Sequence, residues 1–113
     1  MSSGVIANLQ KLIGTPRDGA LLRFSLGNEY LKSGDAHSAQ LHLAEAVARD
    51  PGYSAAWKLL GRALSEDAQP QAALDAYRQG IAVAENKGDK QAAREMTVFA
   101  RRLEKLLESG QPR

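Results

Sequence analysis

Residues 26–30 read LGNEY and residues 60–64 read LGRAL, so the pair Leu-Gly returns after 34 residues (60 − 26). Other residues of helical or apolar character recur in the same register. The matched pairs are Leu26 with Leu60, Gly27 with Gly61, Tyr30 with Leu64, Ala39 with Ala73, Leu43 with Tyr77, and Ala46 with Gly80. A fixed period of this length is typical of proteins that stack one structural unit on the next. We therefore predict two copies of one unit.

Gly27 and Gly61 each lie inside a stretch whose apolar residues have helical spacing. Glycine inside a helix costs roughly 0.5–1 kcal/mol relative to alanine. Two glycines at equivalent positions therefore indicate that a second helix passes too close for a larger side chain. We expect Ala39 and Ala73 to supply the small surface that faces them.

The repeated unit resembles the tetratricopeptide repeat, a helix-turn-helix of this length with a Trp, Leu-Gly, Tyr, Ala, aromatic, Ala and Pro pattern. The second copy has the Trp, as Trp57, and the first has the Pro, as Pro51. Arg23 replaces the Trp of the first copy, and Glu85 stands where the second Pro would fall. The resemblance covers about residues 20–87. It implies an all-α superhelix of antiparallel helix pairs, with one repeat at 20–53 and another at 54–87.

Two repeats are fewer than the three or so that such stacks usually need, so the flanking segments must complete one domain over residues 1–113. Helical spacing of Val5, Ile6, Leu9, Leu12 and Ile13 predicts an N-terminal helix at 5–13. Thr15 and Pro16 have the residue types of a helix N-cap and first helical position, so the next helix is expected to begin there.

A C-terminal capping helix is predicted at residues 89–109, because Glu95 falls 34 residues after Gly61 and breaks the repeat (95 − 61). Asp35, Ser54 and Asp89 are expected to cap three of the helices, and Pro70 to open another. One apolar face is expected on the last helix. It consists of Ala92, Met96, Phe99, Leu103 and Leu106.

The composition, 43% hydrophobic and 25% charged residues, is that of an ordinary globular protein. Fifteen basic against thirteen acidic residues leave a net charge of +2, which indicates no particular partner. The chain has no cysteine, which excludes disulfides and thiolate metal sites. With no signal-peptide pattern before Gly14 and no long apolar run, we expect a cytoplasmic protein without a membrane segment.

The resemblance implies a function in protein–protein interaction, because in this family the first helix of each pair lines a concave binding side. Helical geometry predicts the partner-binding residues on that side. They are Phe24, Asn28, Lys32, Lys58 and Arg62. Lys58 and Arg62 lie four residues apart, a like-charge pair that a carboxylate between them would stabilise.

Some family members grip a peptide's C-terminal carboxylate with a Lys, Asn, Asn, Lys, Arg set, which suggests an acidic or C-terminal partner group here. Asn28 matches the first Asn, but Phe24 replaces the Lys before it and Leu59 replaces the later Asn. An alternative treats Lys58 and Arg62 as surface charges, one of them paired with Glu66. Phe24, likewise, is either an anchor for an apolar partner side chain or packed against the N-terminal helix.

Single sequence features bear on metal binding, catalysis, nucleic-acid binding and self-association. His37 and His42 lie five residues apart, on different helical faces, and each is expected in solvent rather than at a shared metal. The sequence has no catalytic constellation or phosphate loop, so we predict neither an enzyme nor a cofactor. Two alternatives stay open. They are nucleic-acid binding through Arg94, Arg101, Arg102 and Lys105 of the last helix, and self-association (a homo-oligomer) through the N-terminal helix.

Overall fold

The computed structural model describes residues 2–110, which form helices and connecting turns without a strand in that range. The helices are α1 (Ser2–Gln10), α2 (Ala20–Lys32), α3 (Ala36–Arg49), α4 (Ser54–Glu66), α5 (Pro70–Asn86) and α6 (Lys90–Ser109). No helix of this part is long and apolar enough to cross a membrane. The all-α fold predicted from the repeat is therefore confirmed.

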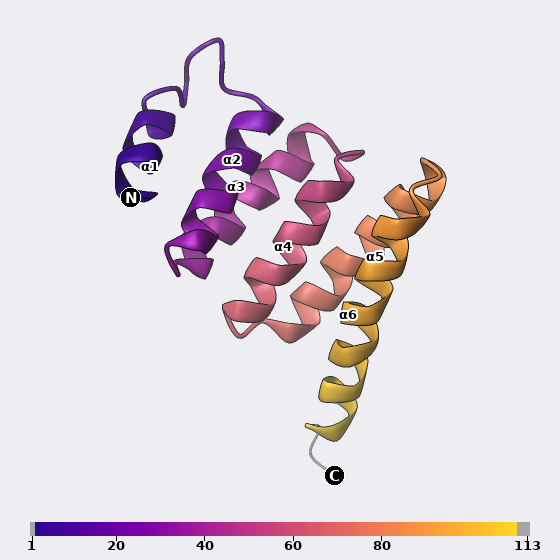
Figure 1. The fold of residues 1–113 in the computed structure, drawn as a ribbon. Helices are drawn as coiled ribbons and strands as arrows, with labels where there is room; N and C mark the ends of the chain where they lie inside the picture. Colours follow the sequence, from indigo (N-terminus) through magenta and orange to yellow (C-terminus); the bar gives the residue numbers. More distant parts are fainter. Residues whose placement is uncertain (1, 111–113) are drawn as a thin grey trace.

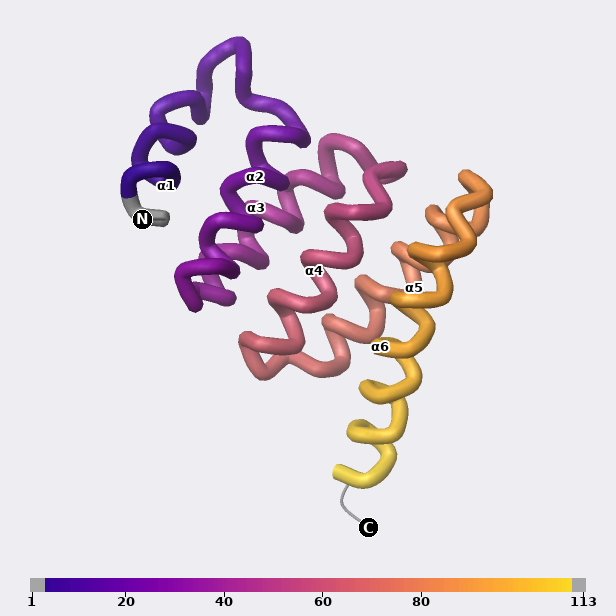
Figure 2. Tube along the Cα trace, viewed as in Figure 1, coloured from indigo at the N-terminus to yellow at the C-terminus, as the bar shows by residue number. Residues whose placement is uncertain are grey.

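The helices stack as antiparallel pairs in an elongated body with principal extents of 48 × 32 × 21 Å. Figure 1 shows α2, α4 and α6 in one layer, with α3 and α5 in a layer behind them. Each helix packs against its neighbours along the chain, and α4 also contacts α2 and α6. The tube in Figure 2 follows this path from α1 at one end of the stack to α6 at the other.

The 34-residue period holds for both pairs but not for the last helix. α4 begins 34 residues after α2 (54 − 20) and α5 begins 34 after α3 (70 − 36), whereas α6 begins 36 after α4 (90 − 54). The difference of two arises because α5 is three residues longer than α3 (17 − 14), while the turn after α5, residues 87–89, is one residue shorter than the turn after α3, residues 50–53. The prediction that Glu95 replaces the repeated glycine is therefore wrong. Thr97 falls 36 residues after Gly61, and Glu95 is instead partly exposed beside Lys58.

The repeated glycines do lie at close helix contacts. A Cβ atom on Gly27 would be 2.6 Å from Leu43 Cδ2, and one on Gly61 would be 2.6 Å from Tyr77 Cε1. Atoms this close would overlap, so a larger residue at either site forces the neighbouring side chain to move. The nearest atoms come from these two large side chains and not from Ala39 and Ala73, which corrects the expectation of a small facing surface.

Two of the three expected N-caps form. Asp35 accepts a hydrogen bond from the Ser38 backbone N–H at 3.0 Å, and Asp89 accepts one from Ala92 at 3.1 Å. Ser54 is not a cap, because it is already the first helical residue of α4, and the N-cap residue Tyr53 makes no side-chain cap bond. Pro70 opens α5 as expected.

The N-terminal segment differs most from its prediction. The helix expected at 5–13 occupies Ser2–Gln10, and the next helix begins at Ala20 and not at Pro16. Thr15 Oγ1 accepts a hydrogen bond from the Arg17 backbone N–H, but this closes a turn and starts no helix. α1 packs on α2 by burying Ile6 with two leucines of α2, Leu22 and Leu26.

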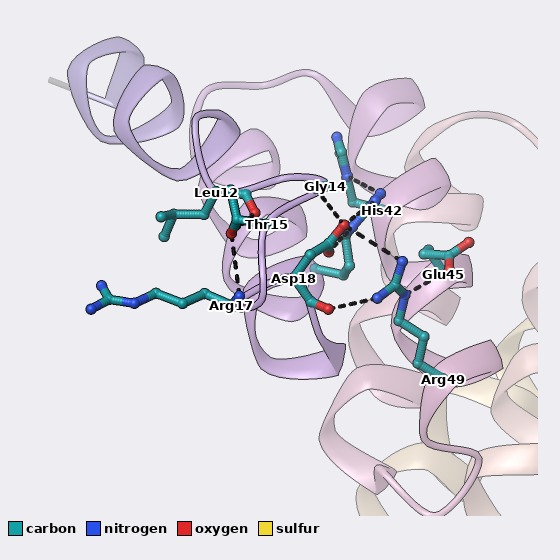
Figure 3. A network of polar contacts seen from close by, with 9 residues as sticks. Leu12, Gly14, Thr15, Arg17, Asp18, His42, Glu45 and Arg49 are labelled. Carbon is teal, nitrogen blue, oxygen red and sulfur yellow. Dashed lines mark hydrogen bonds and ion pairs between the residues drawn. The ribbon is translucent and has the colours of Figure 1, made fainter.

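Asp18 explains why the chain stays in a loop here (Figure 3). Its carboxylate accepts hydrogen bonds from Arg23 Nε at 2.9 Å and from the Gly14 backbone N–H at 2.9 Å. Arg49 of α3 donates to the Asp18 carbonyl at 2.7 Å. The bonds from Arg23 and Gly14 hold the pKa of Asp18 well below its usual range. One carboxylate, with its side chain only 8% exposed, therefore ties the loop to α2 and α3.

The core runs through the stack and ends on α6. Met96 and Leu103 are buried and Phe99 is partly buried, as the predicted apolar face requires. Leu106, placed on the same face, is 56% exposed, so this part of the prediction is wrong. The buried stripe turns towards Ala93 and Ala100 instead.

Candidate binding groove

Three adjoining hollows lie between α4 and α6, on the layer formed by the first helices. The largest measures about 480 Å³ and the others about 360 and 290 Å³. Phe99 lines all three, and we call them together the α4–α6 groove. Its lining residues are Lys58, Leu59, Arg62, Ser65, Glu66, Tyr77, Glu95, Val98, Phe99, Arg102, Leu103 and Leu106.

The centre of the groove is aromatic with a cation beside it. The Phe99 ring stacks on Tyr77 with 5.5 Å between centroids, and the Arg102 guanidinium carbon lies 5.8 Å from the Phe99 centroid. Burial raises the pKa of Tyr77 to about 12, so this phenol is neutral at physiological pH. The groove thus offers an apolar surface for a ligand side chain and a cation next to it.

Lys58 and Arg62, both predicted binding residues, lie together in the groove. Lys58 Nζ is 2.7 Å from Glu95 Oε1 of α6, and this hydrogen bond holds the pKa of Glu95 below its usual range. Arg62 Nε is 2.8 Å from Glu66 Oε2, the pairing that the surface-charge alternative proposed. A carboxylate ligand would have to compete with these partners.

Phe24, Asn28 and Lys32 line none of these three hollows. Phe24 is stacked on the Tyr53 ring with 4.9 Å between centroids and packs on the main core, so of its two alternatives the packing against the N-terminal helix is wrong. Asn28 is partly buried on α2, and Lys32 Nζ is 3.3 Å from Glu29 Oε2. The predicted residues therefore fall into two groups, one on α2 and one in the groove.

Phe99 and Arg102 were not predicted as binding residues. The apolar pattern placed Phe99 on the core face and the charge pattern placed Arg102 on a basic helix, because the last helix was expected to be a cap outside the repeat. Gly52 and Gly88 are 36 residues apart (88 − 52), and this spacing is the signal that α6 takes the place of a first helix. In the family that the repeat resembles, first helices line the concave side. With α6 taken as a first helix, Phe99 and Arg102 would have been predicted as partner-binding residues.

The basic residues of α6 point to different places. Arg102 belongs to the α4–α6 groove, whereas Arg94 and Arg101 line a separate hollow. The four basic residues named for nucleic-acid binding therefore do not all line one hollow.

The two histidines also lie apart. His42 is not in solvent as expected, because it stacks on Tyr30 with 5.5 Å between centroids and burial lowers its pKa. His37 is exposed and lies 3.1 Å from Asp67. Within residues 2–110, no three His, Cys, Asp or Glu side chains gather as a metal site would require.

Comparison with known proteins places this geometry in a family, although no family model matches the sequence. The chain is 48% identical over 101 residues to a TPR repeat-containing protein of Pseudomonas aeruginosa, covering 89% of this chain and 96% of that protein. A solution structure from Bordetella parapertussis is 37% identical, covers 89% of this chain and 88% of its own, and has a TM-score of 0.75.

The Sgt2 TPR domain of Aspergillus fumigatus is 25% identical, covers 99% of this chain and 74% of its own, and has a TM-score of 0.79. The helix pairs, the close contacts at Gly27 and Gly61 and these likenesses agree with one another. The chain belongs to the tetratricopeptide repeat family.

Proposed function

We propose that the protein is a non-catalytic cytoplasmic adaptor that binds a peptide segment of a partner protein in the α4–α6 groove. Proteins with this fold act in general as protein-interaction modules, which supports the class of function. The observation that carries the proposal is the set of joined hollows around Phe99, with cations at its rim.

The chemistry of the groove favours a peptide with an apolar side chain next to a carboxylate. Phe99 would contact the apolar side chain. Arg102 has no carboxylate within ion-pairing distance in the described part of the chain, so its guanidinium is available for a bidentate contact. Lys58 and Arg62 would give up their ion pairs with Glu95 and Glu66 and pair with the carboxylate of the ligand instead. Phe24, Asn28 and Lys32 would extend the contact along α2.

A library of peptides with free C-termini, displayed and selected on the purified protein, tests this proposal. We expect selected peptides to share an apolar residue near a carboxylate. The double variant Arg62→Glu with Arg102→Glu should bind them at least about tenfold more weakly in fluorescence anisotropy, because the two new carboxylates would repel the carboxylate of the peptide.

The matched control is Lys11→Glu with Arg17→Glu, an equal charge change on exposed residues of the N-terminal loop. It should bind like the parent. Equal affinity of the groove variant and the parent, with circular dichroism unchanged in both, would refute the groove as the binding surface.

A further inference from the structure

A further hollow lies beside the α4–α6 groove, on the outer side of α6, and measures about 640 Å³, more than each of the three hollows of the groove. We call it the outer hollow. It is lined by Glu85, Gly88, Lys90, Ala93, Arg94, Thr97, Val98 and Arg101, which come from the end of α5, the following turn and α6.

The repeat explains why a hollow lies here. On α4, the corresponding face is covered by α5, whose Tyr77 ring packs over Gly61. Thr97 falls 36 residues after Gly61 and lines the outer hollow. α6 thus has the position of a first helix, and in residues 2–110 no helix follows it to cover this face.

The chemistry of the outer hollow indicates the occupant. Its apolar lining residues include Ala93 and Val98, and Val98 is 48% exposed. Three cations, Lys90, Arg94 and Arg101, line the same hollow, with Glu85 as the one lining carboxylate. None of these three cations has a carboxylate within ion-pairing distance in the part of the chain that the structure describes.

We infer that the outer hollow binds an acidic amphipathic helix of a partner protein, and that this helix packs on α6 as α5 packs on α4. An apolar stripe would cover Val98, and carboxylates beside the stripe would pair with the surrounding cations. Because Thr97 stands where α4 has glycine, the docking helix carries a small residue where α5 carries Tyr77. The outer hollow shares Val98 with the α4–α6 groove but none of the groove's cations.

A peptide derived from α5 provides the probe, because α5 already packs on the equivalent face of α4. It has the sequence of residues 70–86 with Tyr77→Ala, and glutamate at the exposed positions Gln71, Arg78, Gln79 and Ala82. Fluorescence anisotropy of the labelled peptide should give saturable binding to the parent protein. The double variant Arg94→Glu with Arg101→Glu should weaken binding at least about tenfold.

Three controls separate the surfaces. Lys105→Glu, an exposed residue of α6 outside the hollow, and the groove variant Arg62→Glu with Arg102→Glu should both bind the peptide like the parent. A peptide with lysine at the four exposed positions should bind more weakly.

Several results would overturn the inference. They are absence of peptide binding, or equal affinity of the parent and the Arg94→Glu, Arg101→Glu variant. A dimer of the parent in analytical ultracentrifugation that this variant dissociates would assign the hollow to a second copy. Tight, salt-sensitive binding of a labelled oligonucleotide that the same variant abolishes would assign it to nucleic acid.

Discussion

Gly61 lies at a close contact between α4 and α5, and Gly27 lies at the equivalent contact between α2 and α3. In both places a large side chain, Tyr77 or Leu43, occupies the space where a Cβ would stand. The absence of a side chain on one helix therefore allows a large side chain on the other. This pairing also contributes to the groove, because the Tyr77 ring that covers Gly61 supports Phe99.

Gly61→Leu should destabilise the protein by about 1–3 kcal/mol, because the new side chain must displace the Tyr77 ring from a packed core. Urea denaturation measures the change. Gly4→Leu is the control, since nothing lies within 4 Å of a Cβ at that position. A Gly61→Leu protein as stable as the parent would show that the α4–α5 contact adapts without cost.

For single residues, the sequence predicted where the repeated glycines lie better than it predicted which side chains face them. The period located Gly27 and Gly61, but it could not identify Leu43 and Tyr77 as the facing residues. That choice depends on how far one helix is shifted along the other, and a period contains no such information. Ser54 failed as a cap for a similar reason, since helix boundaries depend on hydrogen bonds that residue type alone does not fix.

At the scale of the element, α1 and the loop after it are held by few contacts. Ile6 supplies the buried apolar contact with α2, and Gln10 Nε2 donates a hydrogen bond to the Tyr30 hydroxyl at 2.6 Å. Asp18, only 8% exposed, joins the loop to Arg23 and Arg49. The sequence predicted that the next helix begins at Thr15 and Pro16, because these residue types are common at a helix start, and long-range ion pairs are not visible in local patterns.

Asp18→Asn should lower stability at pH 7 and loosen the loop. The ordinary pKa of this carboxyl is 3.8, and its folded pKa is lower, so its contribution is fully present above about pH 4 and is lost as pH falls towards the folded pKa. The difference between parent and variant in urea denaturation should therefore shrink as pH is lowered from 4. Asp75→Asn, on the exposed side of α5, is the control. Equal midpoints of parent and Asp18→Asn at pH 7 would contradict the role of Asp18.

At the scale of the whole molecule, α6 both completes the core and forms one wall of the groove. The stack and its two pairs could be predicted because several residues agree in one register. The two-residue shift before α6 was missed. The longer helix α5 moves α6 along the sequence, while α6 itself keeps the apolar pattern of an amphipathic helix. As a result, the sequence prediction did not place Phe99 and Arg102 in the same site as Lys58 and Arg62.

A chain that ends at Lys87 should aggregate or lose cooperative unfolding. It lacks the buried Met96 and Leu103, each of which contributes about 1.5–3 kcal/mol, and the partly buried Phe99, which contributes less. Together they approach the roughly 5–15 kcal/mol that stabilises a whole domain. Light scattering and urea denaturation test this. Leu106→Ala, at an exposed position of α6, should stay within about 0.5 kcal/mol of the parent. A soluble truncated monomer with the parent's midpoint would show that α6 is dispensable.

The packing of each helix against its neighbours along the chain also has a consequence for how the protein reaches its fold. Contacts between helices that follow each other directly require only short loops to close, so little entropy is spent before the contacts form. Helical proteins dominated by such local contacts fold in microseconds to milliseconds. During synthesis, α2 and α3 can therefore pair while α6 is still inside the ribosome, and the groove is assembled last.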